Sequence, residues 1–154
     1  MAEVLLNQEQ IKEIIPHRDP FLLIDEVLEM EVGKRVVARK YIKADDFWFK
    51  GHFPEKPVTP GVLMVEMLAQ AGAVCILSQP EFKGKIALFA GIDKAKFRRQ
   101  VVPGDVLDLE VEIIAQRGPM GVGKAVASVD GKRAVTCEIK FAVEQELSLI
   151  HISE

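Results

Sequence analysis

The two side chains best suited to acid–base chemistry in this sequence are His52 and Glu66. His52 is followed by three prolines, and Glu66 interrupts the apolar run of residues 62–77. A neutral imidazole accepts a proton near physiological pH, whereas a carboxyl group in apolar surroundings favours its protonated form and suits a general acid. Alternatively, His52 is structural and Glu66 pairs with an arginine elsewhere in the fold.

A helix start lies between these two residues. In Thr59-Pro60-Gly61, the threonine can cap the helix and the proline can occupy its first position. The free N–H groups near Gly61 and the helix dipole can stabilise negative charge on a carbonyl oxygen. Gln70 follows Glu66 by four residues, so the two side chains share a helical face and can hydrogen-bond. Base, acid and oxyanion site together favour proton abstraction beside a thioester carbonyl and loss of a β-substituent.

The elements around this helix predict an α+β fold. A helix that is apolar on nearly every side must be surrounded by protein. Several segments have strand character, and in residues 105–116 apolar and acidic residues alternate with the period of a half-buried strand. We therefore expect a curved antiparallel sheet around the helix. The predicted elements are a short helix at 7–16, strands at 21–31, 34–44, 85–97 (with a possible bulge at Gly91), 105–116 and 132–144, and a hairpin turn at Asp130-Gly131.

Composition narrows the class of protein. The chain has 154 residues, 49% hydrophobic and 28% charged, with a net charge of −3. These values are typical of one globular domain and do not indicate general nucleic-acid binding. The N-terminus carries no secretory signal pattern, so we expect a cytoplasmic protein with no membrane insertion. Cys75 and Cys137 lack metal-ligand spacing and are interpreted as small buried residues.

Three blocks of sequence together resemble one enzyme family. They are "IPHRDPFLLID" (residues 15–25), "GHFPEKPVTPGVLMVEMLAQ" (51–70) and "FAGIDKAKFRRQVVPGD" (89–105). In this order they are similar to the 3-hydroxyacyl-acyl-carrier-protein dehydratases of bacterial type II fatty acid synthesis. The resemblance implies a hot-dog fold, in which an antiparallel sheet wraps a long central helix. On this reading residues 1–147 form a single domain, and residues 148–154 form a disordered or appended tail.

The resemblance also implies roles for individual residues. His52 and Glu66 match the catalytic pair, contributed by two subunits of a homodimer that often assembles as a trimer of dimers. The N–H of Gly61 matches the group that binds the thioester carbonyl, and Gln70 matches the residue that orients the glutamate. Glutamate rather than aspartate at position 66 favours dehydration without isomerisation. One departure is Thr59, where the family usually has methionine, so the pocket wall could differ.

The substrate implied is a (3R)-3-hydroxyacyl chain on the phosphopantetheine arm of acyl carrier protein, with no further cofactor. Its acyl chain would lie in an apolar tunnel, for which Phe89 is a candidate lining residue. A landing surface for the acidic carrier protein is predicted at four basic residues: Lys94, Lys96, Arg98 and Arg99.

Two other functions stay open, a hot-dog acyl thioesterase and a non-catalytic acyl-binding module. No metal site is expected, because His17, His52 and Glu66 are scattered along the chain and His17 more simply shapes the "PHRDP" loop.

Overall fold

The computed structural model describes residues 3–144, which form one six-stranded antiparallel sheet, two α-helices and two short 3-10 helices. The strand order is β1-β2-β4-β5-β6-β3, so β1 and β3 are the edges. The predicted tail at 148–154 lies outside the described residues. The elements in chain order are α1 Gln8–Lys12, β1 Glu26–Glu31, β2 Arg35–Tyr41, η1 Phe47–Lys50, α2 Gly61–Leu77, η2 Pro80–Phe82, β3 Ile86–Phe97, β4 Val106–Arg117, β5 Met120–Val129 and β6 Lys132–Glu144.

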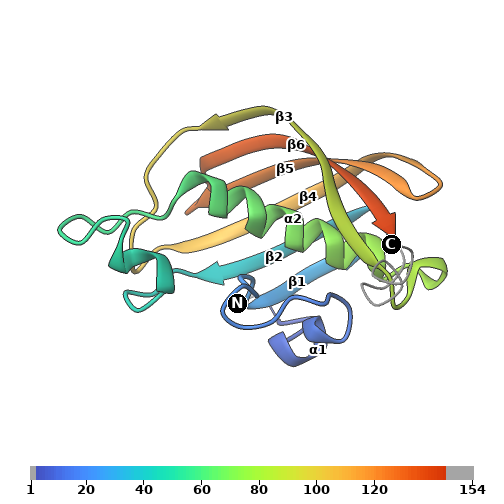
Figure 1. Ribbon diagram of the computed structural model, residues 1–154, viewed down its shortest axis with the longest axis horizontal. Coiled ribbons are helices and arrows are strands. Elements are labelled where there is room, and N and C mark those ends of the chain that lie inside the picture. The colour runs from blue at the N-terminus through green and yellow to red at the C-terminus, as the bar shows by residue number, and fades with distance from the viewer. Residues whose placement is uncertain (1–2, 145–154) are drawn as a thin grey trace, which may run out of the picture.

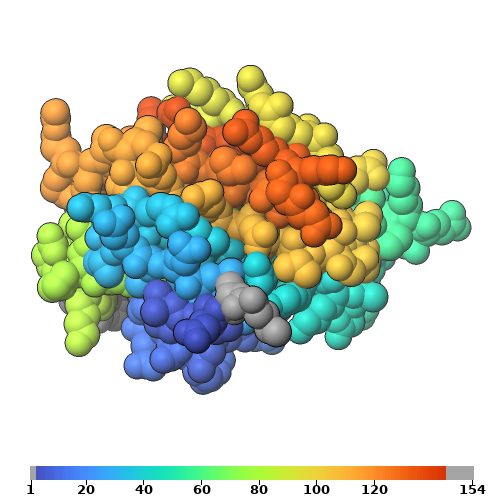
Figure 2. All heavy atoms as spheres, turned by 180° about the vertical axis from the view of Figure 1, so that it is seen from behind, coloured from blue at the N-terminus to red at the C-terminus, as the bar shows by residue number. Residues whose placement is uncertain are grey.

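Helix α2 runs across one face of the curved sheet and packs against all six strands (Figure 1). From Met64 to Leu77 every residue of this helix except Glu66 is buried. The opposite side of the molecule presents side chains of β2, β4, β5 and β6 (Figure 2). This arrangement confirms the predicted α+β fold, a helix wrapped by an antiparallel sheet. None of the helices within residues 3–144 is long and apolar enough to span a membrane.

Turn chemistry fixes much of the strand register. Asp130 and Gly131 both adopt positive φ values, of 50° and 78°, and join β5 to β6 directly. Two consecutive positive φ values give the type I′ turn that matches the twist of a hairpin. The register of β3 on β6 shifts between Phe89 and Gly91, which confirms the predicted bulge.

The N-terminal segment differs from the prediction in two respects. Asn7 caps α1 as expected, but this helix ends at Lys12. Strand β1 begins only at Glu26, because residues 22–24 are buried in succession instead of alternating. A buried loop must still satisfy its backbone groups, and here the side chain of Gln70 on α2 does so.

Candidate active site

His52 is held in a fixed orientation by the loop that carries it. Its backbone N–H donates to the Trp48 carbonyl at 3.0 Å, and its own carbonyl accepts the Val58 N–H at 3.1 Å. Its Nδ1 lies 2.8 Å from the Val58 carbonyl oxygen. A carbonyl can only accept, so Nδ1 carries the proton and Nε2 keeps its lone pair. The ring of His52 is therefore held with Nε2 as the nitrogen that could accept a proton.

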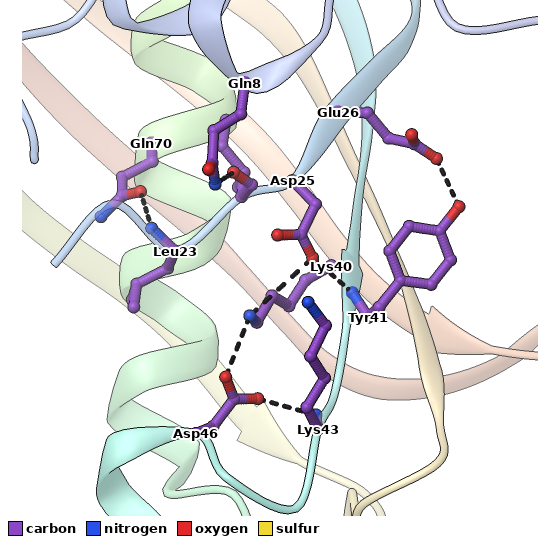
Figure 3. Close-up of polar contacts among 10 residues, drawn as sticks. Gln8, Leu23, Asp25, Glu26, Lys40, Tyr41, Lys43, Asp46 and Gln70 are labelled. Carbon is purple, nitrogen blue, oxygen red and sulfur yellow. Dashed lines mark hydrogen bonds and ion pairs between the residues drawn. The ribbon is translucent and has the colours of Figure 1, made fainter. Parts of the chain in front are cut away.

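A buried ionic network anchors the segment that leads to His52 (Figure 3). The Lys40 ammonium, whose side chain is 8% exposed, lies 3.2 Å from Asp46 and 3.8 Å from Asp25. Asp46 also accepts the backbone N–H of Lys43 at 2.8 Å, and Asp25 accepts that of Tyr41 at 2.7 Å. Removing one member of such a network leaves a buried charge unpaired. The network fixes the chain between β2 and η1, the element just before His52.

The start of α2 differs in detail from the prediction. The helix begins at Gly61 with Pro60 as its N-cap, and no side chain caps it. The expectation that Thr59 caps the helix is wrong: its hydroxyl is buried without a hydrogen-bond partner among the described residues, while its backbone N–H donates to Val101. Within residues 3–144 the N–H of Gly61 donates to no backbone or side-chain acceptor. It therefore remains available to a ligand oxygen, as the first N–H groups of a helix usually are.

His52 and Gly61 line the same pocket, whose volume is about 560 Å³. Its wall also includes Thr59, Phe97 and the basic side chain of Arg98. A Cβ atom on Gly61 would lie 2.5 Å from the Phe97 ring, so glycine allows this ring to cover the helix start. The pocket thus combines a base, a free helix N–H and an apolar wall, which suits a thioester with an acidic α-proton.

Glu66 does not line this pocket; its polar contacts are with Gln70 and His17. Gln70 donates from Nε2 to Glu66 Oε2 at 3.0 Å, which confirms the predicted hydrogen bond between them. The same amide accepts the Leu23 N–H at 2.9 Å (Figure 3). It also donates to the Phe21 carbonyl at 2.8 Å. Gln70 is 1% exposed. One side chain therefore positions the carboxylate and satisfies the buried loop before β1.

His17 is a neighbour of Glu66 that the sequence did not reveal. Its Nε2 lies 3.5 Å from Glu66 Oε2, and the two side chains are 23% and 18% exposed. The "PHRDP" motif suggested only a loop, and no periodicity links residue 17 to residue 66 across the fold. Within the part of the chain that the structure describes, no three His, Cys, Asp or Glu side chains group as metal ligands would.

The other predicted site residues lie along β3 and just beyond it. Phe89 is 43% exposed on this edge strand; it neither lines the His52 pocket nor belongs to the core. All four predicted basic residues are exposed. Arg98 and Arg99 stand at the His52 pocket, whereas Lys94 and Lys96 line a separate hollow of about 220 Å³ with Arg98.

The two cysteines are buried and free, as predicted. Burial raises the pKa of both thiols, that of Cys137 to about 11. A thiol that stays protonated is a poor nucleophile, so neither cysteine is a candidate catalytic residue.

Comparisons with known proteins agree with the fold and the sequence motifs. A family model described as a FabA-like domain matches residues 15–138. A protein of Clostridium novyi (strain NT) named 3-hydroxyacyl-[acyl-carrier-protein] dehydratase FabZ is 62% identical over 90% of this chain and 97% of its own length. A protein of the same name from Staphylococcus aureus (strain JH9) is 59% identical over 92% of this chain and 97% of its own.

Among solved structures, the dehydratase heterocomplex ApeI:P from Xenorhabdus doucetiae aligns with a TM-score of 0.78 at 19% identity, covering 94% of this chain and 97% of that one. At this identity the likeness supports the fold alone, which is the hot-dog fold. Since the family model covers most of the sequence and the curated relatives align over nearly their whole length, the chain belongs to the family of FabA-like domains.

Proposed function

We propose that this protein dehydrates (3R)-3-hydroxyacyl chains carried by acyl carrier protein to trans-2-enoyl chains during fatty acid elongation. The observation that carries this proposal is identity of 59–62% with two named dehydratases over 90–92% of the chain. The protein is accordingly an enzyme, a hydro-lyase. We place the reaction in the cytoplasm.

The proposed chemistry begins at His52. With its proton on Nδ1, bonded to the Val58 carbonyl, the imidazole uses the lone pair of Nε2 to remove the α-proton of the thioester. Negative charge then builds on the thioester oxygen, where the free N–H of Gly61 and the α2 dipole stabilise it. Glu66 gives its proton to the departing β-hydroxyl, which leaves as water while the double bond forms. The substrate arrives on a phosphopantetheine arm, and each step uses only protein groups.

Two subunits would complete the site. In a single chain His52 and Gly61 share a pocket that Glu66 does not line, so we propose that Glu66 of a second copy closes it. Strand β3 supports this assembly because it is a sheet edge with exposed apolar side chains, among them Leu88 (42%), Phe89 (43%) and Ile92 (46%). Such an edge is typically paired or covered. We therefore propose a homodimer, further assembled as a trimer of dimers, with Phe89 lining an acyl tunnel at the interface.

The basic residues near the pocket would receive the acidic carrier protein. Arg98 and Arg99 line the pocket rim, and Lys94 and Lys96 lie beside them on β3. Exposed charges of this kind chiefly raise the association rate, and salt screens them. Replacing Arg98 and Arg99 with glutamate should raise KM for the carrier-linked substrate at low salt, whereas Lys34→Glu, an exposed control in the β1–β2 turn, should not. Equal KM values for both variants would remove the patch from the proposal.

The direct test uses the absorbance of a conjugated enoyl thioester. Addition of the protein to crotonyl-carrier protein should bleach this absorbance by hydration, the reverse reaction, without releasing free thiol. Thiol release would instead identify a thioesterase. No reaction by the wild-type protein, with binding intact, would favour the non-catalytic acyl-binding module.

A further inference from the structure

His17 lies in a loop that its neighbour holds closed. The guanidinium group of Arg18 donates to the carbonyls of Ile15 at 3.0 Å, His17 at 2.7 Å and Lys12 at 3.1 Å. These bonds tie together the chain from Lys12 to Arg18, the segment that carries His17. The imidazole is therefore set against α2 by a rigid loop and does not hang freely from it.

The two nitrogen atoms of His17 have different surroundings. Nδ1 is buried and has no hydrogen-bond partner among the described residues. In proteins a buried N–H without an acceptor is rarer than a buried acceptor without a donor, so the lone pair and not the proton suits Nδ1. The proton therefore belongs on Nε2, the atom 3.5 Å from Glu66 Oε2. Although 3.5 Å is too long for a good hydrogen bond, such contacts shorten when a substrate binds.

Both partners of Glu66 approach the same oxygen. Gln70 Nε2 and His17 Nε2 lie 3.0 and 3.5 Å from Oε2. Throughout residues 3–144 no hydrogen bond or ion pair involves Oε1. Two donors on one oxygen orient the carboxyl plane and occupy that oxygen, so the other oxygen is the one available to carry and release a proton.

We propose that His17 is a positioning residue for Glu66: together with Gln70 it holds Oε2, so that Oε1 meets the β-hydroxyl of the substrate. This role depends on the proposed function of Glu66. His17 itself touches neither the substrate nor the reacting atoms in this proposal.

Three substitutions of His17 test whether its N–H donor, and not only its volume, is needed for activity. His17→Gln keeps a donor near the place of Nε2, His17→Leu keeps volume without a donor, and His17→Asn keeps a polar group too short to reach. For hydration of crotonyl-carrier protein, His17→Leu and His17→Asn should lower kcat about tenfold with KM nearly unchanged, as expected when a hydrogen bond to the charge that forms on Glu66 in the transition state is lost. His17→Gln should restore kcat to within about threefold of wild type. Asp19→Asn, an exposed change in the same loop, is the control and should match the wild type.

A double-mutant cycle distinguishes positioning from a loop defect. If His17 acts through the carboxylate, His17→Leu should cost nothing further in a Glu66→Gln background. The role of His17 is overturned if His17→Leu and His17→Asn keep full activity, or if all three His17 variants lose activity equally. Either result would leave the proposed function of the enzyme intact. Full activity of Glu66→Gln would refute the proposed acid, and an inactive wild-type enzyme would refute the proposed function and the role of His17 with it.

Discussion

Replacing His52 with asparagine should separate its catalytic function from its structural one. Among residues 3–144 the histidine makes one side-chain hydrogen bond, from Nδ1 to the Val58 carbonyl at 2.8 Å. The amide nitrogen of asparagine lies close to the position of Nδ1 and can donate to the same carbonyl. No atom of asparagine replaces Nε2, the proposed base. His52→Asn should therefore keep the loop but lose proton transfer, whereas His52→Ala should lose both.

The magnitudes differ enough to be measured. Loss of a positioned general base lowers the rate about 10²–10⁴-fold, or roughly 3–5 kcal/mol of transition-state stabilisation. Loss of the bond to Val58 costs about 1 kcal/mol of folding stability, because Val58 is only partly buried and water can replace the donor. For a chain of this size 1 kcal/mol corresponds to a Tm change of about 2–4 °C.

The assay is hydration of crotonyl-carrier protein followed by absorbance, with thermal unfolding measured at one fixed protein concentration because subunit assembly contributes to stability. Both variants should lose activity to a similar extent, and only His52→Ala should unfold earlier than the wild type. The reasoning is refuted if His52→Asn keeps more than about a tenth of the wild-type kcat/KM, since a lost base cannot leave that much activity.

Three further predictions concern two residues of α2 and a buried cysteine of β6. Gln70→Leu removes the partner of two loop backbone groups and should lower the free energy of unfolding by roughly 2–4 kcal/mol in urea titrations; an unchanged midpoint would contradict this account. Gly72→Ala should lower the free energy of unfolding by about 1–2 kcal/mol, because the new Cβ would lie 2.6 Å from the buried Phe141 ring. This overpacking outweighs the ~1 kcal/mol by which alanine is favoured over glycine in a helix. A higher Tm would instead show that the Phe141 ring can move aside. Burial raises the pKa of Cys137 to about 11, so above the unfolded thiol pKa, near 8.5, the unfolded chain loses a proton that the folded one keeps. Stability should then fall by up to about 1.4 kcal/mol per pH unit toward pH 11 through this group alone, and Cys137→Ala should show a shallower decline over the same range.

The sequence by itself determined the parts of the fold that depend on local chemistry. Segment 62–77 carries apolar residues on nearly every side, and only the protein interior removes all of them from water. The sequence therefore required a buried helix here. Alternation in 105–116 required a strand with one buried face, and Asp130-Gly131 required a tight hairpin because both residues must accept positive φ. The spacing of Glu66 and Gln70 likewise fixed their contact, since helical geometry places residues four apart side by side.

Tertiary structure decided what depends on distant segments. The sequence predicted Leu23 to lie in a strand, but the structure places it in a loop. Its backbone N–H donates to the side chain of Gln70, so it does not need a partner on a neighbouring strand. His17 reached Glu66 only because the loop before β1 folds back onto α2, a path that no local pattern records. The start of α2 at Gly61 instead of a Thr59 cap reflects the backbone of Pro60, which is non-helical with a ψ of 133° and is itself the N-cap. Local sequence determines which backbone conformations have low energy. Contacts between remote segments then determine which of these conformations forms, because each buried polar group needs a hydrogen-bond partner and that partner often lies far away in the sequence.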